Sequence, residues 1–303
     1  MSHPMKTYFL ACLTAILAVR TSASAEDSAP GLTGIEAVAS RVAPDYKRVK
    51  LPDGSFQQEL YAFGPSGVWG GEIDDPTIDQ LTFLKVAHMI APSLASRNYM
   101  PGADPSQTKF LIMVYWGTTA VPTPLSSSLG MQQFQAAASS PDLGSSLAGI
   151  KNAALDEMSM AMTMIDLLNR VRDQTDFKNA AMLGYDMEGT IGTEYGQYIS
   201  HTALGWRAKD DVEEIEQSRY FVVLMAYDFQ LLWKQKKHKL VWETRFSINE
   251  QHNQFDRALP LLANFASKYY GQPSNGLVRE RLLNPDVEIG APTLIQFMGN
   301  PKN

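Results

Sequence analysis

The chain has 303 residues, of which 45% are hydrophobic and 19% charged, a composition that is typical of folded globular proteins and excludes a largely disordered chain. It carries 26 Lys and Arg residues against 32 Asp and Glu residues, so its net charge at pH 7 is -6. This acidic balance argues against nucleic acid or an anionic membrane surface as a partner, because such surfaces are bound by clusters of Lys and Arg.

The first 25 residues have the pattern of a secretory signal peptide. Lys6 precedes an apolar run of 13 residues, and the small residues Ala23, Ser24 and Ala25 form a cleavage motif before Glu26. A membrane-spanning helix needs about 20 apolar residues, and this run is shorter. We therefore expect cleavage after Ala25, a secreted or periplasmic location, and no transmembrane segment in the mature chain.

The single cysteine, Cys12, lies within the predicted signal peptide. Cleavage would leave a mature chain without a thiol, which excludes disulfide bonds, a cysteine nucleophile and zinc sites with cysteine ligands. The alternative is a lipoprotein, in which Cys12 would carry the lipid, because residues 9–12 loosely resemble a lipobox.

The mature chain begins with a predicted flexible leader over residues 26–44, followed by a hairpin over residues 46–63 that turns at Pro52-Asp53-Gly54. Asp75, Pro76 and the helical spacing of the apolar residues predict a helix that ends near Arg97. The uninterrupted apolar run from Lys109 to Gly117 predicts a strand buried on both faces.

The second half of the core begins with another apolar run, Arg219 to Asp228. Residues 240–248 then alternate between apolar and polar side chains, which predicts a strand near the sheet edge with one wet face. We expect the two strands to form an antiparallel hairpin, with the basic stretch of residues 234–239 in solvent. A helix over residues 256–270 and a docked tail over residues 272–303 complete the chain.

Residues 119–216 separate the two halves and predict an inserted helical subdomain. The insertion opens with a linker rich in Ser, Pro and Ala and becomes helical over residues 147–171. The sequence thus predicts an α+β fold, in which residues 45–118 and 217–271 build an antiparallel-rich sheet with helices packed on it.

This order of elements resembles a bacterial family of envelope domains that are secreted or lipid-anchored and have no established activity. The resemblance depends on Tyr61-Ala62-Phe63, the strand KFLIMVYWG, Asp228 and Leu240-Val241-Trp242, and it covers residues 45–118 and 218–270. The helical insertion departs from the family pattern. The resemblance implies an α/β sandwich in the cell envelope and assigns no chemical role to Asp228 or Trp242.

The loop from Gly184 to Gly196 has the composition of a possible ligand site. It contains four glycines and the carboxylates of Asp186, Glu188 and Glu194. Carboxylate and backbone oxygens bind Ca²⁺, although the spacing here is not that of an EF-hand. The same carboxylates could serve a hydrolase, and an ordinary solvated turn is the simpler interpretation.

Alternating methionines mark the insertion: Met158, Met160, Met162 and Met164. Thioethers bind soft ions such as Cu(I), so a copper-binding protein is one hypothesis. On a helix, however, Met158 and Met162 face one way, while Met160 and Met164 face another. The simpler interpretation is a helix buried on two sides, and the same apolar surface could equally form a homodimer.

The remaining candidates have simpler interpretations. The histidines left after cleavage, His88, His201, His238 and His252, lack a local zinc motif, so only a scattered zinc site is conceivable. The five acids of residues 209–216 are typical of a solvated helix start. The basic stretch 234–239 is typical of a soluble hairpin end, and the alternative is a contact with an anionic envelope polymer.

The sequence contains no nucleophile elbow, phosphate-binding loop or dinucleotide-binding motif. We therefore predict no catalytic, cofactor or metal residues and expect a secreted cell-envelope protein that acts as a binding or structural component. A carboxylate-dependent hydrolase and a methionine-rich copper-binding protein are the alternatives.

Overall fold

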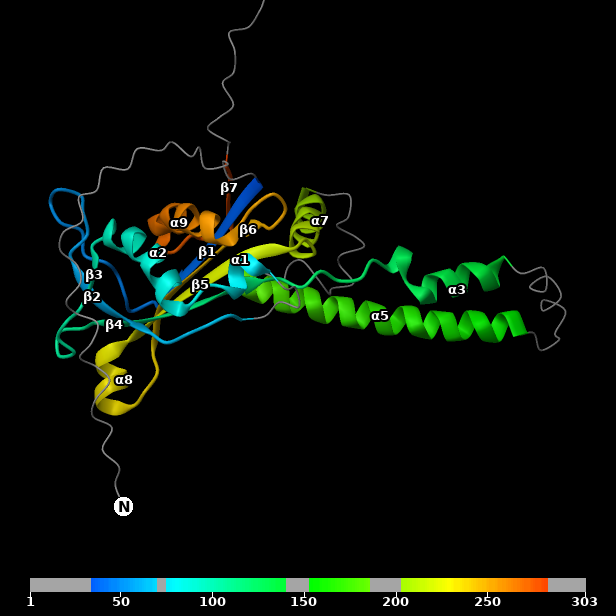
Figure 1. The fold of residues 1–303 in the computed structure, drawn as a ribbon, viewed down its shortest axis with the longest axis horizontal. Coiled ribbons are helices and arrows are strands. Elements are labelled where there is room, and N and C mark those ends of the chain that lie inside the picture. The colour runs from blue at the N-terminus through cyan, green and yellow to red at the C-terminus, as the bar shows by residue number, and fades with distance from the viewer. Residues whose placement is uncertain (1–33, 70–74, 140–152, 186–202, 283–303) are drawn as a thin grey trace, which may run out of the picture.

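The computed structural model describes residues 34–69, 75–139, 153–185 and 203–282 (Figure 1). Within these ranges the strands form one seven-stranded sheet in the order β3-β2-β4-β5-β6-β1-β7. The strands, in that order, are Tyr99–Pro101, Glu59–Gly64, Phe110–Thr118, Arg219–Asp228, Leu240–Asn249, Gly34–Val42 and Val278–Leu282. β2 pairs in parallel with β3 and β4, and the other neighbours are antiparallel.

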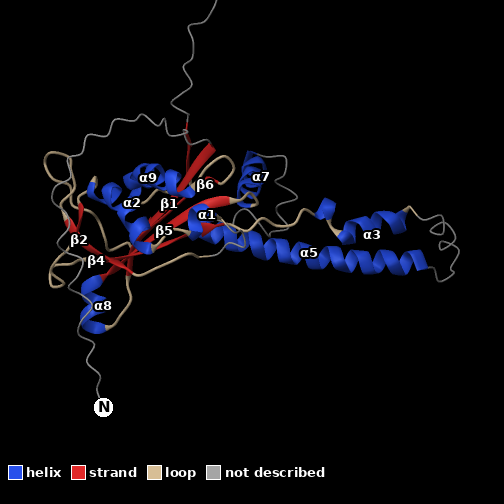
Figure 2. Ribbon diagram, in the orientation of Figure 1, coloured by secondary structure: helices blue, strands red, loops and turns tan. Residues whose placement is uncertain are grey.

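Helices cover both faces of the sheet. The helices α1 (Pro76–Asp79), α2 (Phe83–Ala95) and α9 (Phe255–Ala266) pack on one face, and the C-terminal end of α5 (Ala153–Leu183) packs on the other with α7 (Ala203–Ile215). The remaining α-helices of the described ranges are α3 (Leu129–Ala138), which lies along α5, and α8 (Phe229–Gln235), which follows β5. Figure 2 shows the helices in blue around the strands in red. The predicted α+β class is confirmed, although the sheet is mixed rather than antiparallel-rich.

The main core lies between the sheet and the α2/α9 layer. It joins Trp242 and Phe246 of β6 to Ile90 of α2 and Leu259 of α9, all of which are fully buried or nearly so. A smaller core on the opposite face joins Leu183 of α5, Ile215 of α7, and Phe221 and Val223 of β5. Because consecutive residues of a strand point to opposite faces, β5 supplies Val222 and Leu224 to one core and its neighbours to the other.

The predicted leader over residues 26–44 is wrong for its second part. Residues 34–42 form β1, which lies between β6 and β7 and pairs with both. This strand contains no long apolar run, and its partners come from the far end of the chain. Part of the predicted C-terminal tail forms one of them, because residues 278–282 are β7. The predicted signal peptide and residues 283–303 lie outside the described residues.

The predicted elements of the first half are shorter in the structure. The hairpin over residues 46–63 reduces to an isolated bridge between Lys50 and Phe56, followed by β2. The predicted helix from Asp75 divides into α1 and α2. Asp75 does cap the first of them, because its carboxylate accepts a hydrogen bond of 2.7 Å from the backbone N–H of Thr77.

The antiparallel pairing of β5 with β6 is confirmed, but β6 is not near the edge and has no wet face. Beyond it lie β1 and β7, and α5 covers the side that carries Glu243 and Ser247, both of which are buried. Arg245 on the same side donates a hydrogen bond to the carbonyl of Ala181 near the end of α5. These polar residues are therefore inside the protein because another element covers them.

The insertion is helical, as predicted, with different boundaries. Its described helices are α3, α5 and α7, so a helix occupies part of the predicted linker. Ser128 begins α3, accepting a hydrogen bond of 3.1 Å from the backbone N–H of Met131. The acids of residues 209–216 lie in the second half of α7 and just after it, so the predicted helix start is wrong.

Candidate functional site

A helical arm projects from the body of the protein. We define the arm as α3 together with residues 153–171 of α5, and Figure 1 shows it extending well beyond the sheet. The two helices approach closely at Gly130, where an added Cβ atom would lie 3.0 Å from Cγ of Met164 and 3.4 Å from Cγ1 of Ile165. Close approach of this kind requires a glycine in α3, so the sequence is suited to the pairing of these helices.

The arm exposes most of its large apolar side chains. Only one flank of α5 faces α3, and Ala161 is fully buried there. The exposed fractions are 73% for Met160, 59% for Met162, 56% for Leu167 and 53% for Val171. The predicted helix buried on two sides is therefore wrong, because the short helix α3 covers only one of its flanks.

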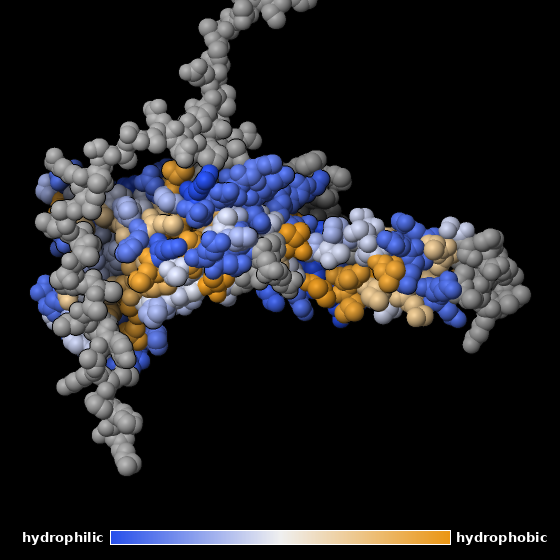
Figure 3. Space-filling model, viewed as in Figure 1, coloured by the Kyte–Doolittle hydropathy of each residue, from blue (hydrophilic) through white to orange (hydrophobic). Residues whose placement is uncertain are grey.

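Met164, which is 41% exposed, lies in a row with three of these side chains. Met160, Met164, Leu167 and Val171 follow one another at steps of four, three and four residues, which keeps them on one side of a helix. We call these four residues the apolar stripe. At about 100° per residue, Met162 points to the opposite flank of α5. Figure 3 shows hydrophobic surface gathered along α5 between the body and the tip.

The root of the arm is held by a buried amide. The side chain of Asn179, which is fully buried, donates hydrogen bonds to the carbonyls of Ala120 at 2.7 Å and Ile215 at 3.0 Å, and it accepts one of 3.2 Å from the backbone N–H of Ala120. Ala120 follows β4, and Ile215 ends α7. One side chain thus joins α5 to two other segments, which sets the direction in which the arm leaves the body.

Charged groups surround this junction. Arg172 of α5 donates a hydrogen bond of 2.6 Å to the carboxylate of Glu216, just after α7. Burial, together with the negative charge of Glu216, raises the pKa of the nearby Asp176 to about 6. The junction therefore contains a carboxyl group whose charge changes near pH 6.

A cavity of 870 Å³ lies on the other side of α7, between that helix and the ends of the strands. Its wall carries acidic residues of α7 and two arginines, Arg219 and Arg279. Arg279 is already engaged, because its Nε donates to both carboxylate oxygens of Glu214 at 3.0 Å and its Nη2 donates to Asp211. The cavity is thus polar and of mixed charge, and its ion pairs are satisfied within the protein.

The structure places only some of the sequence candidates. Asp186, Glu188, Glu194 and His201 lie outside the described residues. His88 lies on α2, His238 lies after α8, and His252 lies after β6; all three side chains are exposed. Within the described ranges, no three His, Cys, Asp or Glu side chains are arranged to hold a metal ion. The basic stretch 234–239 ends α8 and continues to β6.

The residues named in the family resemblance have structural contacts. Asp228 caps α8 by accepting a hydrogen bond of 2.9 Å from the backbone N–H of Leu231. Trp242 is buried in the main core, where it stacks on Tyr270 with 5.9 Å between ring centroids. Each contact stabilises the body of the protein.

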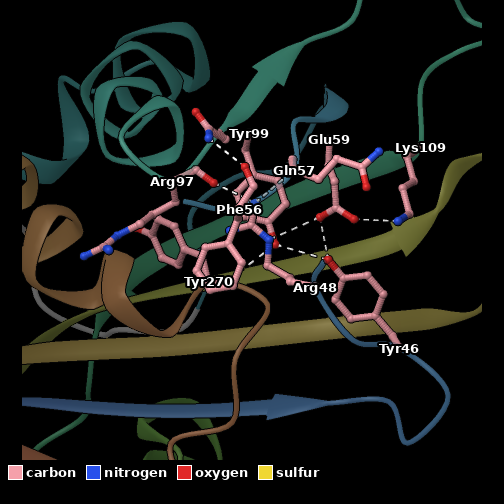
Figure 4. Close-up of polar contacts among 10 residues, drawn as sticks. Tyr46, Arg48, Phe56, Gln57, Glu59, Arg97, Tyr99, Lys109 and Tyr270 are labelled. Carbon is pink, nitrogen blue, oxygen red and sulfur yellow. Dashed lines mark hydrogen bonds and ion pairs between the residues drawn. The ribbon is translucent and has the colours of Figure 1, made fainter. Parts of the chain in front are cut away.

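A buried ion cluster at the β2 end of the sheet was not predicted (Figure 4). The guanidinium of Arg48 lies between the rings of Phe56 and Tyr99, at 4.3 Å and 4.1 Å from their centroids, and donates to the carbonyl of Arg97 at 2.6 Å. Its Nε is 3.4 Å from the carboxylate of Glu59. That carboxylate also accepts hydrogen bonds from Tyr46 at 2.6 Å and Lys109 at 2.5 Å. The cluster anchors residues 43–58 to the sheet.

Gly271 closes this cluster, and we predict that Gly271→Ala lowers the free energy of unfolding by about 2 kcal/mol. Its φ is +65°, and an added Cβ would overlap the hydroxyl of Tyr99 and lie 3.1 Å from Cδ of Arg48. Urea unfolding followed by circular dichroism measures the change. Gly54→Ala is the matched control, because Gly54 has φ +84° but no atom within 4 Å of the added Cβ. Equal losses in the two variants would contradict a steric origin.

Comparisons with known proteins assign no family. No protein-family model matches the chain, and no curated protein matches it significantly. Among solved structures, it is similar to a PDZ domain protein from Parabacteroides distasonis, with 11% sequence identity and a TM-score of 0.35. The match covers 82% of this chain and 39% of that protein, and likeness this weak is no basis for an inference. None of the helices in the described ranges has the length and apolar character needed to cross a bilayer.

Proposed function

We propose that this protein is a secreted component of the cell envelope that binds another protein chain through its arm and has no catalytic role. The observation that supports the proposal is the apolar stripe, whose side chains are exposed on a helix that projects from the body. Burying apolar surface is favourable by about 25 cal/mol per Å², so a row of this kind favours association. Amphipathic helices often bind partners through such rows.

The location is proposed from the signal-peptide pattern of residues 1–25, and the family resemblance supports it. Fractionation of the natural host, followed by N-terminal sequencing, tests it directly. We expect the protein in the periplasm or the medium, with Glu26 as its first residue. Intact protein in the cytoplasm would contradict this part of the proposal.

The binding role is tested with a photo-reactive amino acid placed in the arm. We expect a residue of this kind at Met160 to form covalent adducts with a protein partner in living cells. The matched control is the same residue at Asp166, which is also exposed on α5 but points away from the apolar stripe. Absence of adducts from Met160, or equal adducts from both positions, would contradict a role for the apolar stripe.

The two alternatives stay predictions. Met160 and Met164 are one turn apart on the same flank, where two thioethers could bind Cu(I), and elemental analysis of protein purified without chelator tests this. The hydrolase depends on Asp186, Glu188 and Glu194, which lie outside the described residues.

A further inference from the structure

The spacing of the apolar stripe is that of a helix-pairing seam. Steps of four, three and four residues are the d-a-d-a spacing of a heptad repeat, in which two helices pack side by side. Met160, Met164, Leu167 and Val171 occupy those positions over three turns of α5. Their flank adjoins the one that faces α3, and Met164, which contacts α3 at Gly130, borders both. The four side chains are still exposed beside α3, so a second helix can pack there while α3 keeps its place.

The charges along α5 indicate the direction of the helix that pairs with it. Asp156 and Glu157 lie on the N-terminal side of the apolar stripe and are exposed. The exposed Lys178 lies beyond its C-terminal end, whereas Arg170 is already paired with Asp166 of the same helix. A parallel copy of the helix would place the acids of both chains together, whereas an antiparallel copy places the acids of each chain near Lys178 of the other.

We propose that the apolar stripe binds a second copy of this chain, with the two α5 helices antiparallel about a two-fold axis between Met164 and Leu167. Met164 then faces Leu167 of the other copy, and Met160 faces Val171. Each arm contributes α3 and α5, so the dimer forms a four-helix bundle. This inference names the partner in the proposed function and rests on it.

The dimensions of the arm are compatible with this arrangement. At 1.5 Å per residue, the axis lies about 16 Å from Asp176, where α5 meets the body. The other copy of α5 extends about 19 Å beyond the axis, so its first residue lies level with Lys178, which is exposed on this helix. At that level Asp156 and Glu157 of one copy lie beside Gln174 and Lys178 of the other.

The mass of the purified protein in solution tests the dimer. We expect light scattering to give twice the mass of one chain, and the double variant Met160→Lys/Leu167→Lys to give half that value, because a lysine ammonium would be buried on each side of the axis. Met162→Lys is the matched control and should stay dimeric, since Met162 is exposed on the same helix but on the opposite flank. A monomeric natural protein, or dissociation by Met162→Lys alone, would overturn the proposal.

Disulfide trapping tests the antiparallel direction, in a background with Cys12→Ser. In the antiparallel dimer the two copies of residue 164 are displaced by about 4.5 Å along the helices, whereas the two copies of residue 160 are displaced by about 16.5 Å. Disulfides need Cα atoms within about 7 Å. In mixtures, Met160→Cys should therefore cross-link to Val171→Cys, and Met164→Cys should cross-link to Leu167→Cys more readily than to itself, because those pairs lie level with each other. Efficient self-linkage of Met160→Cys would show a parallel dimer and overturn the arrangement.

The two proposals can fail separately. A monomeric protein that still forms adducts with another envelope protein from Met160, and none from Asp166, overturns the dimer and leaves the binding role intact. A monomeric protein without such adducts overturns both.

Discussion

Replacement of Asn179 by alanine is expected to lower the free energy of unfolding by about 3–5 kcal/mol. The Asn179 side chain makes three hydrogen bonds with backbone groups of Ala120 and Ile215 in a buried junction. Alanine would leave these groups without partners, and a buried polar group without a hydrogen bond costs about 1–3 kcal/mol. The loss should also loosen the arm at its root, because α5, α7 and the end of β4 meet at this side chain.

Urea unfolding measures the stability, and hydrogen exchange measures the local effect. In the Asn179→Ala variant, we expect the exchange of backbone amides to accelerate more at the junction than in β5, which lies in the centre of the sheet. Gln174→Ala is the control, since Gln174 is exposed on the same helix, and its effect should stay within about 0.5 kcal/mol. An Asn179→Ala protein as stable as this control would show that the junction does not depend on the amide.

The second large effect is a pH dependence that comes from Glu36. This residue lies on β1 opposite Glu280 of β7, its side chain has no exposed surface, and neither carboxylate oxygen has a hydrogen-bond partner among the described residues. Burial is the main cause that raises the pKa of Glu36 to about 9, and the charge of Glu280 adds to it, while Lys268 and Arg219 oppose it. The carboxyl group is therefore neutral in the folded protein at pH 7.

The direction of the pH dependence follows from the pKa of Glu36 in the folded and in the unfolded protein. Above a pH of about 4.5 the unfolded chain releases this proton, whereas the folded protein keeps it up to a pH of about 9. The contribution of Glu36 to stability is thus fully present below pH 4.5 and is lost as the pH rises toward 9. At about 1.4 kcal/mol per pH unit, the loss between pH 5 and pH 8.5 is roughly 3–5 kcal/mol.

Glu36→Gln removes the titrating group, and we expect it to remove this loss. The difference in unfolding free energy between the variant and the natural protein should be about 3–5 kcal/mol more favourable to the variant at pH 8.5 than at pH 5. Urea unfolding of both proteins at several pH values measures this difference. Glu213→Gln is the control: its carboxylate is exposed on α7, so the stability of this variant should follow the pH dependence of the natural protein closely. Parallel pH profiles for Glu36→Gln and the natural protein would contradict a neutral Glu36.

The surface of the arm could be predicted in part. The spacing of Met160, Met164 and Leu167 on one side of a helix is evident from the sequence, and Val171 continues the same spacing. Whether that side is buried is not a local property, because it depends on how much of α5 the neighbouring helix covers. No local pattern distinguishes Asn179 or Glu36 from polar residues on a wet surface, since each is buried by segments from other parts of the chain.

The sequence by itself determined the α+β class, the strands β4, β5 and β6, and the helix α9, because runs and periodicities of apolar residues reflect which side of an element is buried. Only the tertiary structure decided that residues 34–42 and 278–282 are neighbouring strands. Their pairing depends on backbone groups far apart in the chain, and side-chain patterns record this pairing poorly. The same holds for the exposure of the apolar stripe, which results from the length and position of α3.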